Sequence, residues 1–379
     1  MDFNLSEERQ MLADTAGRFI ADRYDIATRH ANAELEDGFN RKTWAELAEL
    51  GLIGALLPPE VEGFGGLGED IAVVFEALGR GIVVEPFLAT GILGASPIAL
   101  AGSGEQKAML EDVMSGKTLL ALAHGEPEGR YDLSAVKTQA NKEGDGWRLN
   151  GRKAVVLNGD TADKLVVSAR VSGNGVDEDG IALFLVDSNA VGVSRRGYGT
   201  IDGSRAAEIS LANVAVQDDA LIGEAGKAFA TIETTHTRGI IALCAEALGA
   251  MDVAKETTLE YLKTRKQFGR PIGAFQALQH RMVDMIMEIE QARSGVMLAA
   301  GTLEAPRAER ERNASAAKNL IGRVGRLVSE ETIQMHGGIA MTWEYSAPHF
   351  AKRLTMIDHQ LGDTDYHLER FQKFANEAA

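Results

Sequence analysis

The order in which helical and strand-like patterns follow each other most constrains the fold of this chain. Apolar residues first recur at helical spacing, short runs bounded by glycine, asparagine and aspartate follow, and long helical patterns fill the remainder. These two changes of periodicity predict an α+β multidomain protein. We expect an N-terminal α-helical domain over residues 1–120, a middle β-barrel or β-sandwich domain over 121–228, and a C-terminal four-helix bundle over 229–379.

The N-terminal segment begins with a helix signal, because Ser6 is a candidate cap and two glutamates occupy the first turn after it. Residues 24–38 are polar and are not expected to be helical. Proline and glycine punctuate the stretch from Pro58 to Gly68. Helical patterns are expected over 43–51, 71–79 and 106–115.

The later elements can also be placed from the pattern. Strands are expected at 147–149, 154–157, 165–169, 181–186, 207–211 and 214–216. Helices are expected at 231–263, 275–301 and 307–335, followed by a last helix that ends near residue 374. Pro306 lies in the turn between the second and third of these helices, and the pair Gly337 and Gly338 ends the third.

Charge and composition exclude several classes of protein. The 39 basic and 55 acidic residues give a net charge of −16, which disfavours binding to nucleic acid and to anionic membranes. We expect no membrane insertion, because a spanning helix needs about 18 or more apolar residues in a row. The polar start from Met1 to Glu8 does not resemble a signal peptide, so a cytoplasmic protein is expected.

The sequence also argues against several kinds of catalytic site. Cys244, the single cysteine, lies in an apolar stretch and is expected to be a buried thiol. The histidines lack metal-ligand spacing, so no metal is expected. The chain contains no nucleophile elbow, no P-loop and no dinucleotide-binding glycine motif after a strand.

Three clusters could carry chemistry. The first, Tyr261 to Gln279, places basic residues at a helix end, then a turn, then a new helix. There Arg265 offers a planar charged donor fork and Gln267 an amide, which together suit an anionic cofactor group. A solvated helix end has the same composition, because basic residues are favoured near a helix C-terminus.

The second cluster, Gln334 to Gly338, contains two glycines that would let a ligand approach the backbone closely, although a simple helix cap looks the same. The third, Gly362 to His367, contains two carboxylates, a phenol and an imidazole. It could supply an acid or a base. An aspartate-rich turn that caps a helix is the other interpretation.

These motifs together resemble the acyl-CoA dehydrogenase family along essentially the whole chain. Arg265-Lys-Gln-Phe-Gly-Arg-Pro-Ile followed by Phe275-Gln276 is similar to the flavin-binding helix junction of that family, and Gln334-Met-His-Gly-Gly338 to its Gln-x-x-Gly-Gly element. Resembling segments also lie earlier in the chain, at Gly63–Gly66, Glu76–Gly79, Trp147–Lys153 and Glu208–Val214.

The resemblance implies a reaction and a cofactor. In the family, a carboxylate removes the proton α to an acyl-CoA thioester while the β-hydride passes to FAD, and the electrons leave through an electron-transfer flavoprotein. The arginine and the Gln-x-x-Gly-Gly element cross a subunit interface to bind the ADP half of a neighbour's flavin. By this resemblance the cofactor-binding residues are Arg265, Gln267, Phe268, Ile272, Phe275, Gln334, Gly337 and Gly338.

The chain departs from the family where the catalytic base and the flavin ring would lie. The usual glutamate falls on Gly362, and the alternative base position, before Arg238, is Thr237. The flavin-facing Trp-Ile-Thr corresponds to Val155–Leu157, which lacks the hydroxyl, and Thr-Glu-Pro is altered to His124-Gly-Glu-Pro127. The resemblance therefore implies that the ADP clamp is kept while both usual base positions are empty.

Three hypotheses follow. In the first, the chain is the base-less subunit of a heterotetramer and supplies the clamp to a second family member. Ser194–Tyr198 and Gly362–His367 resemble the small subunit of pimeloyl-CoA dehydrogenase, and related two-chain enzymes act on steroid side chains. In the second, a homo-oligomer uses Asp363 or Asp365 as the base. In the third, the chain is a structural or regulatory protein without redox activity.

Overall fold

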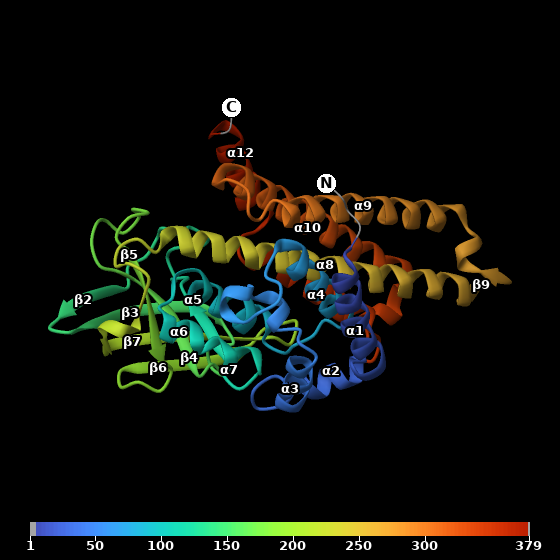
Figure 1. Ribbon diagram of the computed structural model, residues 1–379. Coiled ribbons are helices and arrows are strands. Elements are labelled where there is room, and N and C mark those ends of the chain that lie inside the picture. The colour runs from blue at the N-terminus through green and yellow to red at the C-terminus, as the bar shows by residue number, and fades with distance from the viewer. Residues whose placement is uncertain (1–4, 378–379) are drawn as a thin grey trace. The chain divides into compact units, whose positions relative to one another are not determined.

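The computed structural model describes residues 5–377 and divides into two compact units (Figure 1). Unit 1 consists of 1–31, 67–83 and 240–379, and unit 2 of 32–66 and 84–239. Each unit is described by itself below. The predicted α+β architecture, with helices, then a sheet, then long helices, is confirmed. Among the described residues, no helix is long and apolar enough to cross a membrane.

The first helices of the chain begin as the sequence predicts. Helix α1 (Glu7–Arg23) starts at Ser6, whose hydroxyl accepts a hydrogen bond from the Arg9 amide at 3.3 Å. Residues 24–38 are not all loop, because helix α2 (Ile26–Ala33) forms within them. The prediction missed α2 because its eight residues are too few to show a helical pattern. Helix α4 (Gly68–Gly81) covers the predicted pattern at 71–79.

Unit 1 contains the long helices, whose ends agree closely with the prediction. They are α8 (Phe229–Thr264, which begins in unit 2), α9 (Gln276–Gly301) and α10 (Arg307–His336). The last predicted helix is in fact two, α11 (Ala347–His359) and α12 (Thr364–Glu377). The break occurs where Leu361 and Gly362 adopt φ values of +57° and +106°, which an α-helix does not allow.

Glycine allows helices of unit 1 to meet at the backbone. A Cβ atom at Gly79 of α4 would overlap the main chain of Glu246 in α8, and one at Gly249 of α8 would overlap Glu76 of α4. Helix α9 packs on α10, and α10 also packs against α11 and α12. The helices after α8 therefore form a bundle around α10, as the four-helix prediction implies.

Unit 2 is built on one mixed eight-stranded sheet in the order β6-β7-β3-β2-β4-β5-β8, with β1 pairing in parallel with β4. The strands are β1 (Leu120–Ala123), β2 (Gln139–Glu143), β3 (Gly146–Leu157), β4 (Lys164–Arg170), β5 (Ile181–Asp187), β6 (Val193–Gly199), β7 (Arg205–Gln217) and β8 (Leu221–Ile222). Two pairs of predicted short strands are single long strands, because β3 and β7 continue through the irregularities at which the pattern was interrupted.

The remaining elements of unit 2 are short helices. They are α3 (Arg41–Glu49), the 3-10 turns η1 (Gly54–Leu56), η2 (Pro59–Val61) and η4 (Asp218–Ala220), the π-helix η3 (Phe87–Gly94), α5 (Ala95–Ala101), α6 (Gly104–Ala108) and α7 (Leu110–Met114). Apolar side chains of the strands form a buried core that includes Leu149, Val167, Phe184 and Ile209. This core fixes the positions of the polar side chains described below.

Candidate functional site

The connection between α8 and α9 is a small hairpin, not a frayed helix end. Strands β9 (Lys266–Gln267) and β10 (Arg270–Pro271) pair antiparallel, and the 3-10 turn η5 (Ile272–Ala274) leads into α9. The Ile272 amide donates to the Arg265 carbonyl at 2.8 Å and closes the hairpin. The tip therefore presents Arg265 and Gln267 as exposed side chains from a fixed backbone.

The hairpin tip also carries an exposed aromatic ring. Phe268 is 91% exposed and has φ of +51°, and its ring lies edge-on to Phe275 at 6.1 Å between centroids. The Arg270 guanidinium lies 4.2 Å from the centroid of the Phe275 ring. The Phe268 ring is therefore free to contact another molecule at this tip.

The end of α10 provides the second segment. Gly337 has φ of +68°, and its amide donates to the Ile333 carbonyl, so the helix stops there and the 3-10 turn η6 (Gly337–Met341) begins. Gln334 is exposed. Among the described residues, no atom lies within 4 Å of where a Cβ would stand at Gly337 or Gly338. The backbone here is open to a ligand.

An aromatic stack brings these two segments together. The His336 ring lies 4.6 Å from that of Tyr261 near the end of α8, and 5.1 Å from that of Tyr345. Burial lowers the pKa of His336, and its Nδ1 lies 2.7 Å from the Thr332 carbonyl. The neutral ring therefore joins two segments that are well separated in sequence at one end of unit 1.

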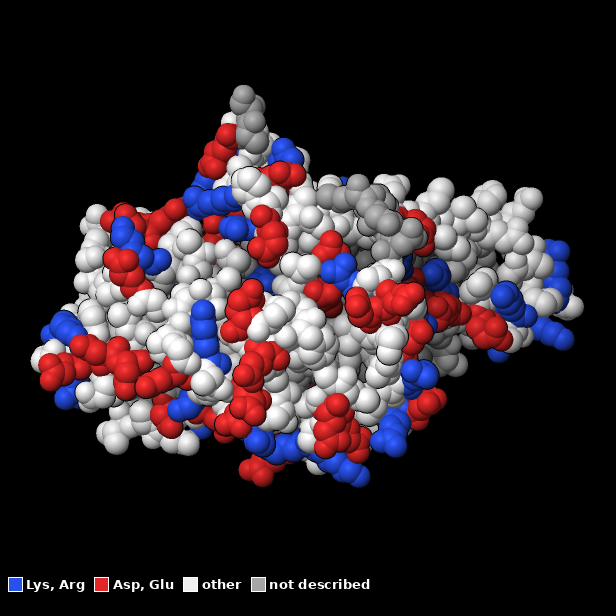
Figure 2. Space-filling model, in the orientation of Figure 1, with Lys and Arg blue, Asp and Glu red and all other residues white. Residues whose placement is uncertain are grey.

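The charge at this end of unit 1 is positive, although the chain as a whole is acidic. Lys263 in the last turn of α8 is exposed, as are Arg265, Lys266 and Arg270 on the α8–α9 connection. Figure 2 shows this Lys and Arg cluster at the tip that Figure 1 labels β9. Guanidinium groups, amides and an open glycine backbone are the donor set that a diphosphate requires, so the residues present fit the ADP half of FAD.

The third predicted cluster is a helix cap. The Asp363 carboxylate accepts a hydrogen bond from the Tyr366 amide at 2.9 Å and so caps the first turn of α12. Asp365 is exposed, and His367 is fully buried with Nε2 2.9 Å from the Leu361 carbonyl. This geometry matches the capping interpretation of the sequence. The carboxylate that makes the cap is that of Asp363, the candidate substitute base.

His367 predicts a dependence of stability on pH. Burial, and to a smaller extent Lys318 and Arg370, lowers the pKa of His367 to about 3. The unfolded chain therefore binds a proton below about pH 6.5 that the folded chain does not, and stability falls as the pH falls. Between pH 6.5 and 5.0 this residue is expected to cost about 2 kcal/mol. Urea unfolding at several pH values measures the slope.

The control for this prediction is His367→Gln, which keeps a hydrogen-bond donor and removes the titration. Below pH 6.5, the unfolding free energy of the wild type is expected to fall with pH more steeply than that of the variant, by about 1.4 kcal/mol per pH unit. An unchanged slope would contradict the prediction.

The other usual base position lies in unit 2. The Thr237 side chain is fully buried, and its hydroxyl donates to the Glu233 carbonyl at 3.0 Å. The next residue, Arg238, is also buried and donates to the carbonyls of Gly66 and Leu56, each at 2.8 Å. Thr237 therefore makes a structural hydrogen bond within its helix and carries no group that can accept a proton from carbon.

Sequence analysis missed a buried polar cluster in the sheet of unit 2. Lys153 is fully buried, and its ammonium donates to Glu126 Oε1 at 2.7 Å, to Ser168 Oγ at 3.0 Å and to the His124 carbonyl at 3.1 Å. Burial lowers the pKa of Lys153 to about 8 and that of His124 to about 3. Two features of the sequence could have indicated this cluster: Lys153 lies within a β-rich run, and Glu126 lies in the altered His-Gly-Glu-Pro segment.

The strand segment that would face the flavin ring is irregular. The register of β3 shifts between Lys153 and Val156, and Val155 there has φ of +52° and is 59% exposed. The Ala154 amide bonds to the Gly125 carbonyl at 2.8 Å, so the altered His-Gly-Glu-Pro segment lies beside it. This surface offers aliphatic side chains, and the hydroxyl expected from the family is absent from the sequence.

Comparisons with known proteins agree with this geometry. The chain matches the acyl-CoA dehydrogenase N-terminal domain over 6–117, the middle domain over 121–214 and the C-terminal domain over 226–375. It is 31% identical over 364 residues to "Probable acyl-CoA dehydrogenase YngJ" of Bacillus subtilis, covering 94% of this chain and 95% of that protein.

Two solved structures are also similar. A variant of the Tcur3481-Tcur3483 steroid ACAD is 32% identical with a TM-score of 0.88, covering 98% of each chain. The ChsE4-ChsE5 complex from Mycobacterium tuberculosis is 25% identical with a TM-score of 0.90, covering 100% of this chain and 99% of the other.

Proposed function

This chain belongs to the acyl-CoA dehydrogenase family, and we propose that it is the subunit without a catalytic base in a two-chain enzyme of that family. In this proposal it binds the ADP half of a FAD whose ring is held by a partner subunit. The partner supplies the base and the acyl-CoA site, and an electron-transfer flavoprotein accepts the electrons.

The reaction class and the cofactor follow from the family. The protein is an oxidoreductase that acts on the CH–CH group of an acyl-CoA, and its cofactor is FAD. When bound, FAD would supply the acceptor for the hydride of the β-carbon. The residues of this chain bind and orient the cofactor.

The cofactor role is assigned to residues that lie at one end of unit 1. Arg265 and Gln267 on the hairpin would hold the diphosphate, and Gln334 with the open backbone at Gly337 and Gly338 would complete the donor set. Phe268, Ile272 and Phe275 would give the adenine side an apolar wall. These groups bind and orient the cofactor and transfer no proton.

One contrast carries the proposal. The residues assigned as hydrogen-bond donors in the ADP clamp are exposed, whereas neither usual base position carries a carboxylate that could accept a proton. Residue 362 is a buried glycine, and Thr237 carries a hydroxyl that is already bonded within its helix. The nearest substitute, Asp363, accepts the backbone hydrogen bond that caps α12. A base must reach the substrate proton within hydrogen-bond distance, whereas the cap holds the Asp363 side chain against the first turn of its own helix, so this arrangement favours a base from another chain.

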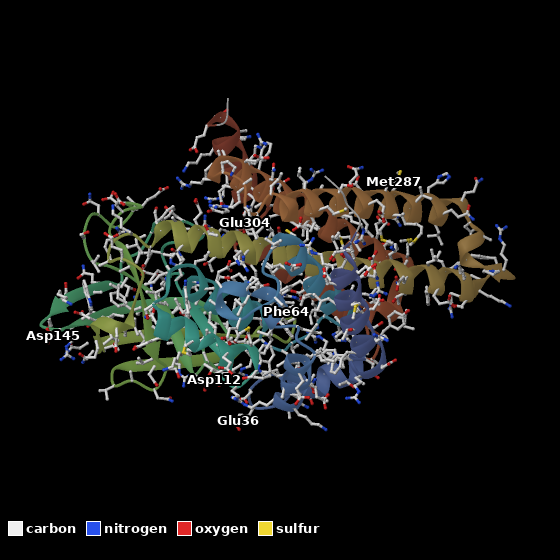
Figure 3. The ribbon with its side chains drawn as sticks, viewed as in Figure 1. Glu36, Phe64, Asp112, Asp145, Met287 and Glu304 are labelled. Carbon is white, nitrogen blue, oxygen red and sulfur yellow. The ribbon has the colours of Figure 1, made fainter. Side chains whose placement is uncertain are left out.

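A surface of unit 1 supports the presence of a partner. Helix α9 exposes Val283 (51%), Met287 (53%) and Leu298 (43%), and Met287 projects outward from it in Figure 3. The same helix shows a stretch without charged side chains in Figure 2. A row of exposed apolar residues on one helix is typical of a subunit interface. Each of the two similar solved structures is also named after a pair of proteins, Tcur3481-Tcur3483 and ChsE4-ChsE5.

The experiment is expression of the chain alone and together with a second family member encoded beside it. Flavin absorbance per chain and acyl-CoA-driven reduction of an artificial acceptor are then measured. We expect flavin and activity only in the mixed complex, at about one FAD per pair of chains. A lone chain that is yellow and active, and that loses turnover in Asp363→Asn or Asp365→Asn, would support the homo-oligomer. A colourless mixed complex would support the non-redox protein.

Arg265→Ala tests the clamp within that complex. A hydrogen bond to a charged group contributes about 1.5–3 kcal/mol, so the affinity of the mixed complex for FAD is expected to fall about 10- to 150-fold. The matched control is Arg326→Ala, because Arg326 is also an exposed arginine, 81% by side chain, paired locally with Glu330. Equal FAD titrations for the two variants would contradict the assignment of Arg265.

A further inference from the structure

The connection between α11 and α12, residues 360–363, is held together with the start of α12 by contacts from three helices of unit 1. We call it the α11–α12 loop. Gln360 Oε1 accepts from Arg353 at 2.9 Å, and the Thr364 hydroxyl donates to Asp358 at 2.8 Å. From α10, the Asn319 amide donates to the Thr364 carbonyl at 2.9 Å. The loop is therefore fixed at both of its ends.

A buried lysine holds the middle of the loop. Lys318 of α10 is fully buried, and its Nζ donates to the Gly362 carbonyl at 2.6 Å and to the Asp358 carbonyl at 3.0 Å. If the backbone at Gly362 moved outward, the buried Lys318 ammonium would lose this acceptor, which is costly. These bonds therefore hold the backbone in place.

Gly362 faces side chains that leave no space for a Cβ atom. A Cβ at this position would lie 2.5 Å from His367 Nε2 and 2.5 Å from Tyr366 Cδ1, closer than real Cβ contacts allow. His367 is fully buried and bonded to the Leu361 carbonyl, so its ring cannot move aside without losing that bond. The φ of +106° is a further barrier to any side chain at 362.

We infer that Lys318 and His367 lock the α11–α12 loop in a conformation that only glycine at 362 permits, so that a glutamate at this position cannot serve as the base. The inference rests on the proposed function and deepens it. Lys318 and His367 are positioning residues, and the base must lie on another chain because this loop is filled from within.

The test compares Gly362→Ala with Gly144→Ala. Gly144 also has a positive φ, +58°, in the hairpin whose tip is marked by Asp145 in Figure 3, and its Cβ position has no neighbour within 4 Å in the described structure. In the mixed complex we expect Gly144→Ala to lower the midpoint of thermal unfolding by about 2–4 °C. Gly362→Ala is expected to lower it by about 4–8 °C.

The larger shift of Gly362→Ala must depend on the His367 ring, which fills the space beside residue 362. In a His367→Ala background, Gly362→Ala is expected to cause a smaller shift than in the wild type. If His367→Ala does not fold, Tyr366→Ala replaces it in the cycle. Equal shifts for the two glycine variants, or an unchanged shift in the second background, would overturn the lock.

A gain-of-function experiment separates this inference from the proposed function. Gly362→Glu in a mixed complex whose partner lacks its own catalytic base is expected to give no reduction of the flavin absorbance by acyl-CoA. Reduction by Gly362→Glu but not by the wild type would overturn the lock and leave the base-less assignment intact. Reduction by the wild-type lone chain would instead overturn the proposed function.

Discussion

Replacing Arg353 by methionine is expected to lower the free energy of unfolding by about 3–5 kcal/mol. The guanidinium makes two hydrogen bonds to the Glu246 carboxylate, at 2.5 and 2.6 Å, and both side chains are less than a tenth exposed. Methionine fills a similar volume but offers no donor, so the buried carboxylate would lose both hydrogen bonds. Urea unfolding followed by tryptophan fluorescence measures the change.

The control is the double variant Glu246→Leu/Arg353→Met, which replaces the whole pair. Breaking a buried ion pair leaves an uncompensated charge, whereas replacing both partners by apolar groups is often close to neutral. The double variant is therefore expected to be more stable than Arg353→Met alone. A double variant that is less stable than either single variant would contradict this account.

The second large effect is expected at Lys153 in the sheet. Lys153→Met should lower the free energy of unfolding by about 3 kcal/mol, because it removes the ammonium that faces the Glu126 carboxylate at 2.7 Å. Glu126 would keep its hydrogen bonds from the amides of Lys137 and Thr138, at 2.8 and 2.9 Å. The loss is therefore expected to be smaller than at Arg353.

Lys142→Met is the matched control for Lys153. Lys142 lies on the neighbouring strand β2, its side chain is 46% exposed, and its ion pair with Asp218 lies in water. Surface substitutions of this kind usually change stability by about 0.5 kcal/mol or less. If both lysine variants lower the urea midpoint equally, burial does not determine the cost.

The long helices could be predicted closely because their signals are local. The pattern at 231–263 corresponds to α8 (Phe229–Thr264), and the pattern at 307–335 to α10 (Arg307–His336). Strands β2 and β6 were missed because most of their residues are polar and exposed. The paired strands around them, and not their own composition, make them strands. The break before α12 did have a local signal, the aspartate-rich turn that begins at Gly362, but the sequence analysis did not use it to divide the last helix.

The candidate site was accessible to sequence reasoning only in part. Arg265 and Gln334 stood out because they matched motifs, and the structure places their segments at one end of unit 1 through the Tyr261–His336 contact. Lys153 and Lys318 did not stand out, because a buried lysine has the same letter as a surface one. Their importance depends on three-dimensional burial, which periodicity of apolar residues does not report.

The packing at Gly362 has an evolutionary consequence. A single codon change from glycine to glutamate there would place a side chain against two rings, so that substitution is expected to lower stability. Residues 366 and 367 would have to become smaller before a glutamate at 362 could be selected. Under the proposed function, a chain that depends on a partner for its base would therefore need at least two substitutions in this loop to become independent of it.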